Sequence, residues 1–397
     1  MSNTGTMKAA RYHQFGGPIL VQTVPKPTIA GKNDRSSGVV IQVKATGVCR
    51  SDWHGWKGHD DDVKHHGLPF IPGHEFSGLI HEMGSAVASS NKFQIGDRVV
   101  VPFILSCGSC RECVRQKPTI CEQQQQPGFT MPGSFAEFVY MPRAERNVTV
   151  LPPNVSFVEA AALGCRFTTA YRAVNQQGAA SSSNSGSDRG RNSHNKSIGV
   201  FGVGGLGLSC IMIAKASQYK QIIAVDVSPR ALQKAKELGA THVINANDKS
   251  DQYVRDEIHA MTGGVNCDLT IDAGGFKSTC ENAAYCTRRG GRMVQVGLPL
   301  PINDNTNSHQ HPLIPMGRIA GHEIEIVGSH GFSAFDMPAI LDMVSRGVLC
   351  PGLLVEREVG LQEGATAIED MNHTSPLGIT MVTRLGDNDH RYQQSRL

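Results

Sequence analysis

Three side chains that lie far apart in the sequence have the chemistry to hold one zinc ion together. His74 lies in the segment Pro72-Gly73-His74-Glu75, and Cys49 and Cys165 are the thiols that would accompany it. A histidine nitrogen and two thiolates suit Zn²⁺, and three protein ligands leave its fourth position open. An open zinc site polarises a bound oxygen and makes it more acidic. The pattern therefore predicts a catalytic zinc site.

The residues after Cys49 could move a proton and support the metal. Ser51 and His54 can pass a proton, and Asp52 can hold the second nitrogen of a metal-bound histidine, as carboxylates behind metal ligands usually do. Three more histidines follow: His59, His65 and His66. A solvated histidine-rich loop is the alternative interpretation, and it is favoured for the last two. For His54, the neighbouring cysteine and serine favour a role in proton transfer.

A second group of cysteines is compact in sequence and has the spacing C-x2-C-x2-C-x7-C. Its members are Cys107, Cys110, Cys113 and Cys121. Four thiolates within one loop can close a tetrahedral shell with no open position, which is typical of a structural zinc site. An iron–sulfur cluster would also accept four cysteines. Zinc is favoured because the rest of the chain predicts zinc chemistry.

A glycine-rich turn follows the buried strand expected at Ile198–Phe201. Its residues are Gly202, Val203, Gly204, Gly205, Leu206 and Gly207, which fit G-x-G-x-x-G. The first glycine allows the tight turn, the second allows close approach of a pyrophosphate, and the last allows the helix expected at Leu208–Ser217 to pack on the strand. The start of that helix attracts phosphates. This arrangement predicts a dinucleotide-binding site.

An acidic residue stands where such a site binds ribose. Asp226 ends the strand expected at Gln221–Val225, about 20 residues after the glycines. A carboxylate there accepts the ribose hydroxyls and repels a 2′-phosphate, so we expect NAD rather than NADP. Arg230 lies close enough in sequence to keep NADP as an alternative.

The hydrophobic patterns predict an α/β protein with a β-rich start and an alternating second part. Short strands are expected near residues 8–15, 39–48, 96–102, 133–140 and 148–151. Strands and helices then alternate from Ile198 to Gly297, with a last strand at Ile324–Ser329, a helix at Phe335–Arg346 and a short β-like tail. Such alternation implies a doubly wound parallel sheet.

Length and composition narrow the class of protein. The 397 residues suggest two or three domains, and a net charge of +3 without a basic block argues against nucleic-acid binding. Met1–Phe15 lacks an apolar stretch, so we expect no signal peptide, and we interpret the uncharged run Ser197–Ala214 as strand, turn and helix rather than a membrane span. The 11 cysteines favour metal binding over disulfides.

Two segments carry separate expectations. Residues 178–197 are mostly Ser, Asn, Gly and Arg, which predicts a surface loop that cannot bury apolar area. The last residues, Ser395-Arg396-Leu397, are similar to the S-K-L peroxisomal address. They predict a peroxisome-type location, with a cytoplasmic location as the alternative.

Together, the Gly-His-Glu-x-x-G segment at His74, the four-cysteine loop and the glycine loop resemble the zinc-dependent alcohol dehydrogenases of the medium-chain dehydrogenase/reductase superfamily. The resemblance covers nearly the whole chain. It implies a GroES-like catalytic domain at 1–167 and 329–397, with a structural-zinc lobe at about 105–123, and a Rossmann NAD-binding domain at 168–328. It also implies a homo-oligomer, either a dimer or a tetramer.

The resemblance also assigns roles to residues. Cys49, His74 and Cys165 would bind the catalytic zinc, with Glu75 behind it, Ser51 taking the alcohol proton and His54 carrying it outward. Further expected contacts are Arg50 with the pyrophosphate, Thr169 with the nicotinamide ring, Val296 and Gly297 with its carboxamide, and Phe103 with the substrate. Trp53 is a second candidate for the substrate pocket, although packing within its loop explains a tryptophan equally well.

The expected reaction is the reversible oxidation of a primary or secondary alcohol to an aldehyde or ketone, with hydride transfer to NAD⁺. A polyol or sugar alcohol is the alternative substrate; related polyol enzymes often have a glutamate as third zinc ligand, where this chain has Cys165. A protein that binds zinc and NAD(H) without catalysis is the competing class. It would need the glycine loop and the structural cysteines, but not Ser51 and His54 beside a zinc site.

Overall fold

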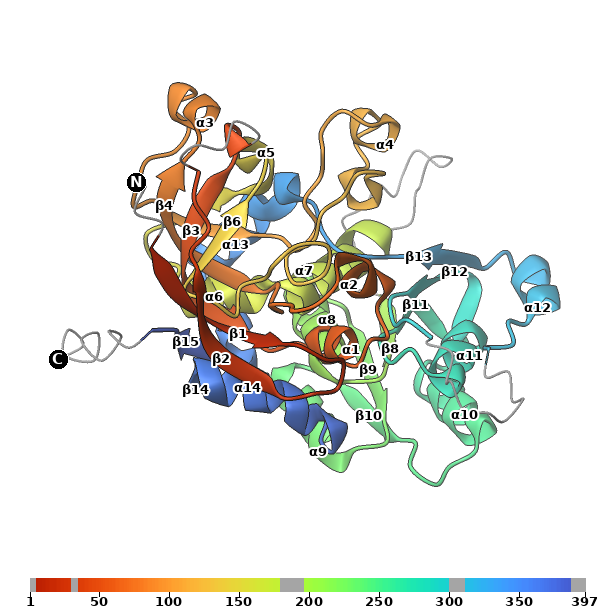
Figure 1. Cartoon of the computed structure of the whole chain (residues 1–397). Coiled ribbons are helices and arrows are strands. Elements are labelled where there is room, and N and C mark those ends of the chain that lie inside the picture. The colour runs from red at the N-terminus through yellow and green to blue at the C-terminus, as the bar shows by residue number, and fades with distance from the viewer. Residues whose placement is uncertain (1–4, 30–34, 179–195, 300–310, 387–397) are drawn as a thin grey trace. The chain divides into compact units, whose positions relative to one another are not determined.

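The computed structural model describes residues 5–29, 35–178, 196–299 and 311–386, and the chain divides into two compact units (Figure 1). Unit 1 contains the described residues up to Thr168 and from Gly331 onward, and unit 2 runs from Thr169 to His330. The 179–195 part of the predicted loop and the terminal Ser395-Arg396-Leu397 lie outside the described residues. No helix in the described ranges is long and apolar enough to cross a bilayer.

Unit 1 is built on a largely antiparallel sheet with the order β14-β15-β3-β4-β5-β7, in which β6 also pairs with β3 and β14 pairs with β15 in parallel. A separate hairpin joins β1 and β2. The strands are β1 (Thr6–Tyr12), β2 (Ile19–Pro25), β3 (Val39–Gly47), β4 (Phe76–Met83), β5 (Arg98–Val101), β6 (Phe138–Met141), β7 (Thr149–Val150), β14 (Val355–Gly360) and β15 (Ile379–Arg384). The central β3 is rich in β-branched residues and almost entirely buried.

Short helices connect and cover this sheet. They are α1 (Arg50–Trp56), α2 (Asp61–His66), α3 (Ser85–Ser89), α4 (Arg111–Val114), α5 (Ala144–Asn147), α6 (Phe157–Leu163), α13 (Met337–Ser345) and α14 (Leu361–Glu369). Helix α7 (Cys165–Tyr171) starts in this unit directly after Gly164, and a π-helical segment, Arg172–Gln177, continues it. Because β3 leads into α1 and α6 leads into α7, Cys49 and Cys165 both lie at helix starts.

Unit 2 is a six-stranded parallel sheet with the order β10-β9-β8-β11-β12-β13. Its strands are β8 (Ser197–Phe201), β9 (Gln221–Asp226), β10 (His242–Asn245), β11 (Cys267–Asp272), β12 (Thr287–Gln295) and β13 (Glu325–Gly328), and its helices are α8 (Gly205–Ala216), α9 (Pro229–Leu238), α10 (Asp251–Met261), α11 (Lys277–Tyr285) and α12 (Met316–Gly321). The strand order reverses direction between β8 and β11. A doubly wound sheet has this order, so the predicted fold class of this part is confirmed.

The structure differs from the sequence-based expectations in several elements. The tail contains helix α14, which we did not predict; its buried Leu361, Ala365 and Ile368 follow helical spacing, but Gly364 interrupts the pattern. Helix α1 was also missed, because its seven residues are too short to show a period. Strand β12 begins at Thr287 rather than at the predicted Gly291.

Candidate active site

Asp52 fixes the orientation of the His74 ring. Its Oδ1 atom accepts hydrogen bonds from His74 Nδ1 at 2.9 Å and from the Gly73 backbone N–H at 3.0 Å, and its Oδ2 atom accepts one from the Cys49 N–H at 2.9 Å. All three bonds are buried. One carboxylate thus ties the start of α1 to the loop before β4 and keeps the proton of the imidazole on Nδ1. The other ring nitrogen, Nε2, is left to act as an acceptor or a metal ligand.

The predicted zinc ligands do come together. Donor atoms of Cys49, His74, Glu75 and Cys165 all lie within 4.8 Å of one another. Cys49 and His74 are buried and Cys165 is partly exposed. His74 Nε2 is buried and has no hydrogen-bond partner among the described residues. Burying a ring nitrogen without a hydrogen-bond partner costs free energy. Together with the two thiols, however, this nitrogen forms a donor set that suits zinc.

The pKa values of the Cys49 thiol and the His74 ring are also shifted. Hydrogen bonding from Cys165 holds the pKa of Cys49 well below its usual range against the effect of burial, and Arg166 adds to the lowering. Burial opposes protonation of His74, but Asp52 outweighs it and raises the pKa of the imidazole. Groups so strongly perturbed in one cluster are typical of a functional site.

Glu75 lies beside these donors, but both of its oxygens are already engaged. Oε1 accepts hydrogen bonds from the backbone N–H groups of Cys165 and Arg166 and from Arg166 Nε, and Oε2 accepts one from Arg166 Nη2 at 3.0 Å. Arg166 Nη2 also donates to the carbonyl of Val48 at 2.5 Å. Glu75 therefore supports the site from behind, and Arg166 joins the segments that carry both cysteines.

The sequence did not lead us to expect a role for Arg166. It is 8% exposed, and its charge is balanced by Glu75, which is fully buried. Its position next to Cys165 was the available signal, since a charged residue inside an otherwise uncharged helical stretch needs a partner when it is buried.

Ser51 and His54 lie three residues apart on α1 and so face the same side of the helix. Both are half-buried. His54 Nδ1 lies 3.2 Å from Nδ1 of His59, an interaction that the sequence did not predict. Burial, and then the charge of Arg50, lower the pKa of His54 to about 4, so its ring is neutral near pH 7.

Two phenylalanines lie beside His74. The ring centroid of Phe103 is 6.0 Å from that of His74, and the centroid of Phe129 is 5.0 Å away. Phe103 was predicted to contact the substrate and Phe129 was not, because nothing in the sequence around residue 129 indicated it. The aromatic pair gives the metal site an apolar border. The guanidinium carbon of Arg50 lies over the Trp53 ring, 3.8 Å from the ring centroid. The indole N–H of Trp53 donates a hydrogen bond to Asn372 Oδ1.

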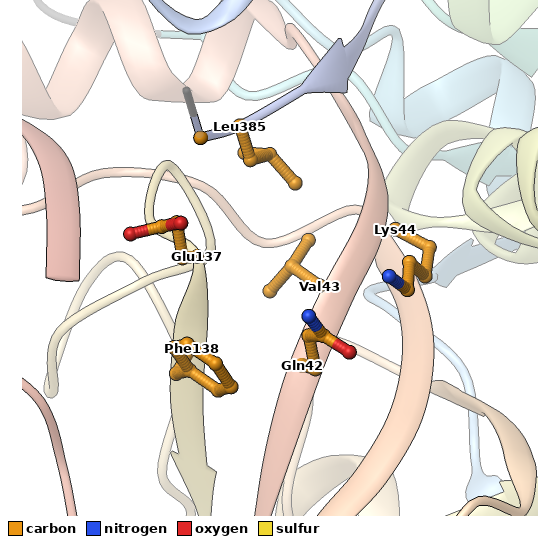
Figure 2. Close-up of a pocket in the computed structure, with 7 residues that line it drawn as sticks. Gln42, Val43, Lys44, Glu137, Phe138 and Leu385 are labelled. Atoms are coloured by element: carbon orange, nitrogen blue, oxygen red, sulfur yellow. The ribbon is translucent and has the colours of Figure 1, made fainter. Parts of the chain in front are cut away.

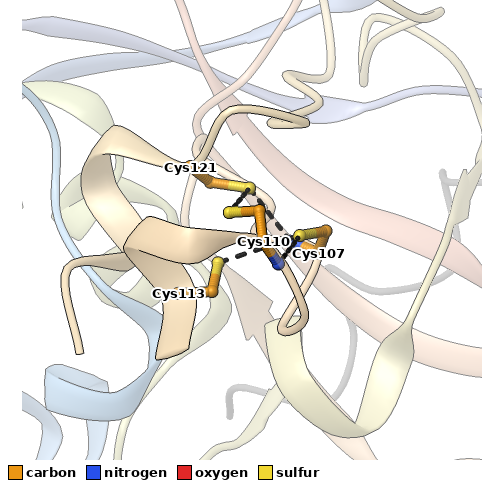
Figure 3. A group of neighbouring side chains, drawn as sticks. All are labelled: Cys107, Cys110, Cys113 and Cys121. Atoms are coloured by element: carbon orange, nitrogen blue, oxygen red, sulfur yellow. Dashed lines mark hydrogen bonds between the residues drawn. The ribbon is translucent and has the colours of Figure 1, made fainter. Parts of the chain in front are cut away.

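The four-cysteine group forms a second metal site, shown in Figure 3. All four sulfurs lie within 4.8 Å of one another, with Cys107 to Cys113 at 3.9 Å and Cys110 to Cys121 at 3.8 Å. Four sulfurs at about 2.3 Å from one zinc ion lie about 3.8 Å apart, so the group fits a single tetrahedral ion. Burial opposes ionisation of Cys107, but the backbone N–H groups of Ser109 and Cys110 lower the pKa of its thiol to about 5.

The glycine loop of unit 2 has the geometry that the sequence predicted. Gly202 has φ +83, which disfavours other residues, and a Cβ atom on Gly207 would lie 2.0 Å from the Gly202 carbonyl oxygen. A Cβ atom on Gly204 would meet no described atom within 4 Å, so the backbone there is open to a ligand. Gly205 and Leu206 begin α8, and the N-terminus of a helix offers unpaired N–H groups that favour phosphates.

Asp226 stands at the end of β9, beside this loop. Its Oδ2 atom accepts the Val203 N–H at 2.7 Å and its Oδ1 atom accepts the Ser228 N–H at 2.8 Å. It therefore shapes the loop as well as carrying a charge there. Arg230 is exposed in the first turn of α9.

The other residues expected at the cofactor belong to both units. Thr169 is 6% exposed, and its hydroxyl has no hydrogen-bond partner among the described residues. Val296 and Gly297 follow β12, and both backbone N–H groups donate to the carbonyl of Asp272. Their contacts with a nicotinamide stay predictions. Arg50 of unit 1 donates to the carbonyl of Met371, and its contact with a pyrophosphate is likewise a prediction.

A separate pocket lies between β3, β6 and the end of β15, as Figure 2 shows. Its lining residues are Gln42, Val43, Lys44, Glu137, Phe138, Leu385 and Gly386. None of them belongs to the metal sites or to the predicted proton path, so we assign it no function.

Two family models match the chain. The model for the alcohol dehydrogenase GroES-like domain matches residues 35–153, and the model for zinc-binding dehydrogenases matches residues 205–346. The first covers Cys49, His74 and the four-cysteine loop, and the second begins within the glycine loop, at Gly205. The GroES-like assignment expected from the sequence is thereby confirmed.

Relatives and solved structures agree with these models. The chain is 36% identical over 305 residues to an alcohol dehydrogenase of Geobacillus stearothermophilus, covering 75% of this chain and 81% of the relative. It is 32% identical to an NAD-dependent alcohol dehydrogenase of Sulfurisphaera tokodaii, over 94% of this chain and 98% of the relative. An alcohol dehydrogenase structure from Thermus sp. ATN1 matches with a TM-score of 0.78 and 26% identity, over 95% of this chain and 100% of that one. The chain belongs to the zinc-dependent alcohol dehydrogenases of the medium-chain dehydrogenase/reductase superfamily.

Proposed function

We propose that this protein oxidises primary or secondary alcohols to aldehydes or ketones, with NAD⁺ as the hydride acceptor, and catalyses the reverse reaction as well. The observation that carries the proposal is the donor set of Cys49, Cys165 and the orphaned Nε2 atom of His74. Three ligands with Glu75 turned toward Arg166 leave one position for a substrate oxygen.

Each residue near this donor set then has a task. A zinc ion bound there supplies a Lewis acid that makes the hydroxyl of the alcohol more acidic. Ser51 would accept the proton of that hydroxyl at Oγ while releasing its own proton, which His54, one helical turn along α1, would take onward. Phe103 and Phe129 exclude water from the side of His74 and favour an apolar substrate. NAD⁺ contributes the hydride chemistry, and the glycine loop orients its pyrophosphate.

The test is the absorbance at 340 nm of the zinc-loaded protein with NAD⁺ and a panel of primary, secondary and polyhydroxy alcohols. We expect turnover of simple alcohols. Better turnover of polyhydroxy alcohols would move the assignment to a polyol dehydrogenase. No turnover of any of them, in protein with both zinc sites filled, would favour the non-catalytic alternative.

We expect Asp226→Asn to weaken the use of NAD⁺. The substitution keeps the shape of the side chain but removes the charge that accepts the ribose hydroxyls. A hydrogen bond to a charged group contributes about 1.5–3 kcal/mol, so kcat/KM with NAD⁺ should fall roughly 10- to 100-fold. The fall with NADP⁺ should be smaller, because the repulsion of a 2′-phosphate is removed as well.

Replacing Arg230 by alanine in the Asp226→Asn background provides the matched comparison. If Arg230 attracts a 2′-phosphate, kcat/KM with NADP⁺ should be lower in the double variant than in Asp226→Asn alone, while kcat/KM with NAD⁺ should be similar in the two variants. An unchanged ratio of NAD⁺ to NADP⁺ activity in Asp226→Asn would remove Asp226 from cofactor selection.

We also propose that the protein is a homo-oligomer that uses the edge of the unit 2 sheet. Strand β13 ends that sheet, and its Ile326 is 41% exposed. An exposed apolar edge strand is a template for pairing with another chain. We expect Ile326→Lys to lower the mass measured by light scattering to that of a monomer, whereas Val265→Lys, at a residue that is 58% exposed elsewhere in unit 2, should not. Equal masses for both variants would exclude this edge.

The location in the cell rests on the sequence alone. Ser395-Arg396-Leu397 lies outside the described residues, and its use as a peroxisomal address stays a prediction, as does the cytoplasmic alternative.

A further inference from the structure

An exposed histidine beside α1 has no role in the reaction as proposed so far. His59 follows α1, and its backbone N–H donates to the carbonyl of His54 at 2.9 Å. The chain turns at Gly58, which has φ +70, and so returns the His59 ring to the side of His54. The two Nδ1 atoms are 3.2 Å apart, and the ring centroids are 5.5 Å apart.

A contact between two Nδ1 atoms constrains the protons on both rings. Only one of the two nitrogens can carry the hydrogen, because the other must accept it. When His54 donates from Nδ1, its Nε2 atom is unprotonated and can accept a proton. The contact between the two Nδ1 atoms then allows onward transfer, because a proton that arrives at Nε2 of His54 allows the proton on Nδ1 of His54 to move to His59.

Neighbouring groups hold the two rings in this arrangement. The indole of Trp53 meets both imidazoles edge-on, with ring centroids 4.9 Å from His54 and 5.4 Å from His59. Trp53 is in turn fixed by Arg50 over its face and by its hydrogen bond to Asn372 Oδ1 at 3.1 Å. The contact between the histidines is therefore built into the fold, and is more than a chance meeting of surface side chains.

Exposure and charge give the pair a direction. His54 is half-buried and His59 is exposed, so the pair leads from the interior to solvent. Burial lowers the pKa of both rings, helped by Arg50 at His54 and by Lys57, Lys64 and Arg50 at His59. Neither ring therefore retains a proton near pH 7, and each can pass it on.

We propose that His59 is the outer member of the proton path, which receives at Nδ1 the proton that His54 releases from Nδ1. His54 gains a proton at Nε2 and loses one from Nδ1, and His59 gains one at Nδ1 and loses one from Nε2 to water. Both rings end neutral with their tautomers exchanged, and rotation or a reverse shift through water resets them. The inference rests on the proposed alcohol oxidation, and assigns His59 to the same reaction.

The experiment measures kcat/KM for alcohol oxidation in wild-type protein and in His59→Gln, His54→Gln and the control His65→Gln. His65 is exposed on α2 and takes no part in the path. Each protein is assayed at constant pH and ionic strength while the concentration of glycinamide, a small amine buffer, is raised. At low buffer we expect His59→Gln to lose roughly three- to tenfold, less than the 10²–10⁴ of a direct acid or base, because water still accepts the proton slowly.

Rescue separates a proton path from a structural role. Rising glycinamide should restore His59→Gln toward the wild type and leave the wild type and His65→Gln unchanged, and the solvent deuterium isotope effect should be larger in His59→Gln. Wild-type values in His59→Gln at every buffer concentration, or a loss that buffer does not restore, would overturn the inference while alcohol oxidation stands. If the wild type itself oxidises no alcohol, the proposed function fails and the path fails with it.

Discussion

His74→Ala should lose alcohol oxidation almost completely. The substitution removes the only nitrogen among the predicted zinc ligands, and a Lewis acid contributes several kcal/mol to the stability of the transition state. Since each 1.36 kcal/mol is tenfold in rate, we expect kcat/KM to fall by about 10³-fold or more. The measurements are turnover with the best alcohol and zinc content by elemental analysis. We expect about one zinc per chain to remain, in the four-cysteine site.

Asp52→Asn provides the matched control for that result. It leaves His74 in place but weakens the buried hydrogen bond that orients its ring. Loss of such a partner typically costs 10- to 100-fold in metal affinity or activity, so this variant should be impaired less than His74→Ala. Full turnover and about two zinc ions per chain in His74→Ala would show that the catalytic metal is bound elsewhere or not needed.

Arg166→Leu should be the most destabilising single substitution near the site. Glu75 would keep its buried charge without the guanidinium that balances it, and removing one partner of a buried ion pair costs about 3–5 kcal/mol. We expect the free energy of unfolding, measured in urea by circular dichroism, to fall by about that amount. Zinc should also be lost faster to a chelator, because Val48 and Cys165 are no longer held by one side chain.

Two further variants test whether loss of the ion pair between Glu75 and Arg166 causes the loss of stability in Arg166→Leu. In Glu75→Gln with Arg166→Leu the unbalanced charge is gone, so a large part of the lost stability should return. Arg346→Leu removes a surface pair with Asp342, in which both side chains are about 60% exposed, and should cost less than about 1 kcal/mol. Equal losses in Arg166→Leu and Arg346→Leu would show that the buried pair contributes nothing special.

The parallel unit could be predicted from the sequence because its elements are defined locally. Buried apolar strands alternate with helices, and Gly202, Gly207 and Asp226 stand at fixed distances along one short segment. Unit 1 was harder to predict, since its strands are brief and pair with distant segments. Helix α1 is too short to show a period, and Gly364 interrupts the pattern of α14. Tertiary packing determines where those elements form, and a short stretch of sequence carries no information about that packing.

The residues of the candidate site could likewise be predicted only in part. Cysteines and His74 could be selected by residue type alone, and the structure brings their donor atoms together. Arg166, Phe129 and His59 could not, because their significance comes from neighbours more than 40 residues away or across a turn: Glu75, His74 and His54. Residue type predicts what a side chain can do, and only the fold shows what it meets.

The hydrogen bonds of Asp52 and Arg166 have a consequence for how the protein acquires its catalytic metal. Asp52 joins Cys49 to His74, and Arg166 with Glu75 joins Val48 to Cys165, all without using a ligand atom. The donors are thus assembled by the polypeptide itself, so little conformational entropy remains to be lost when an ion arrives. We therefore expect the ion to enter a finished fold late, and another divalent ion that accepts sulfur and nitrogen, such as cobalt, to exchange into the same position without refolding of the chain.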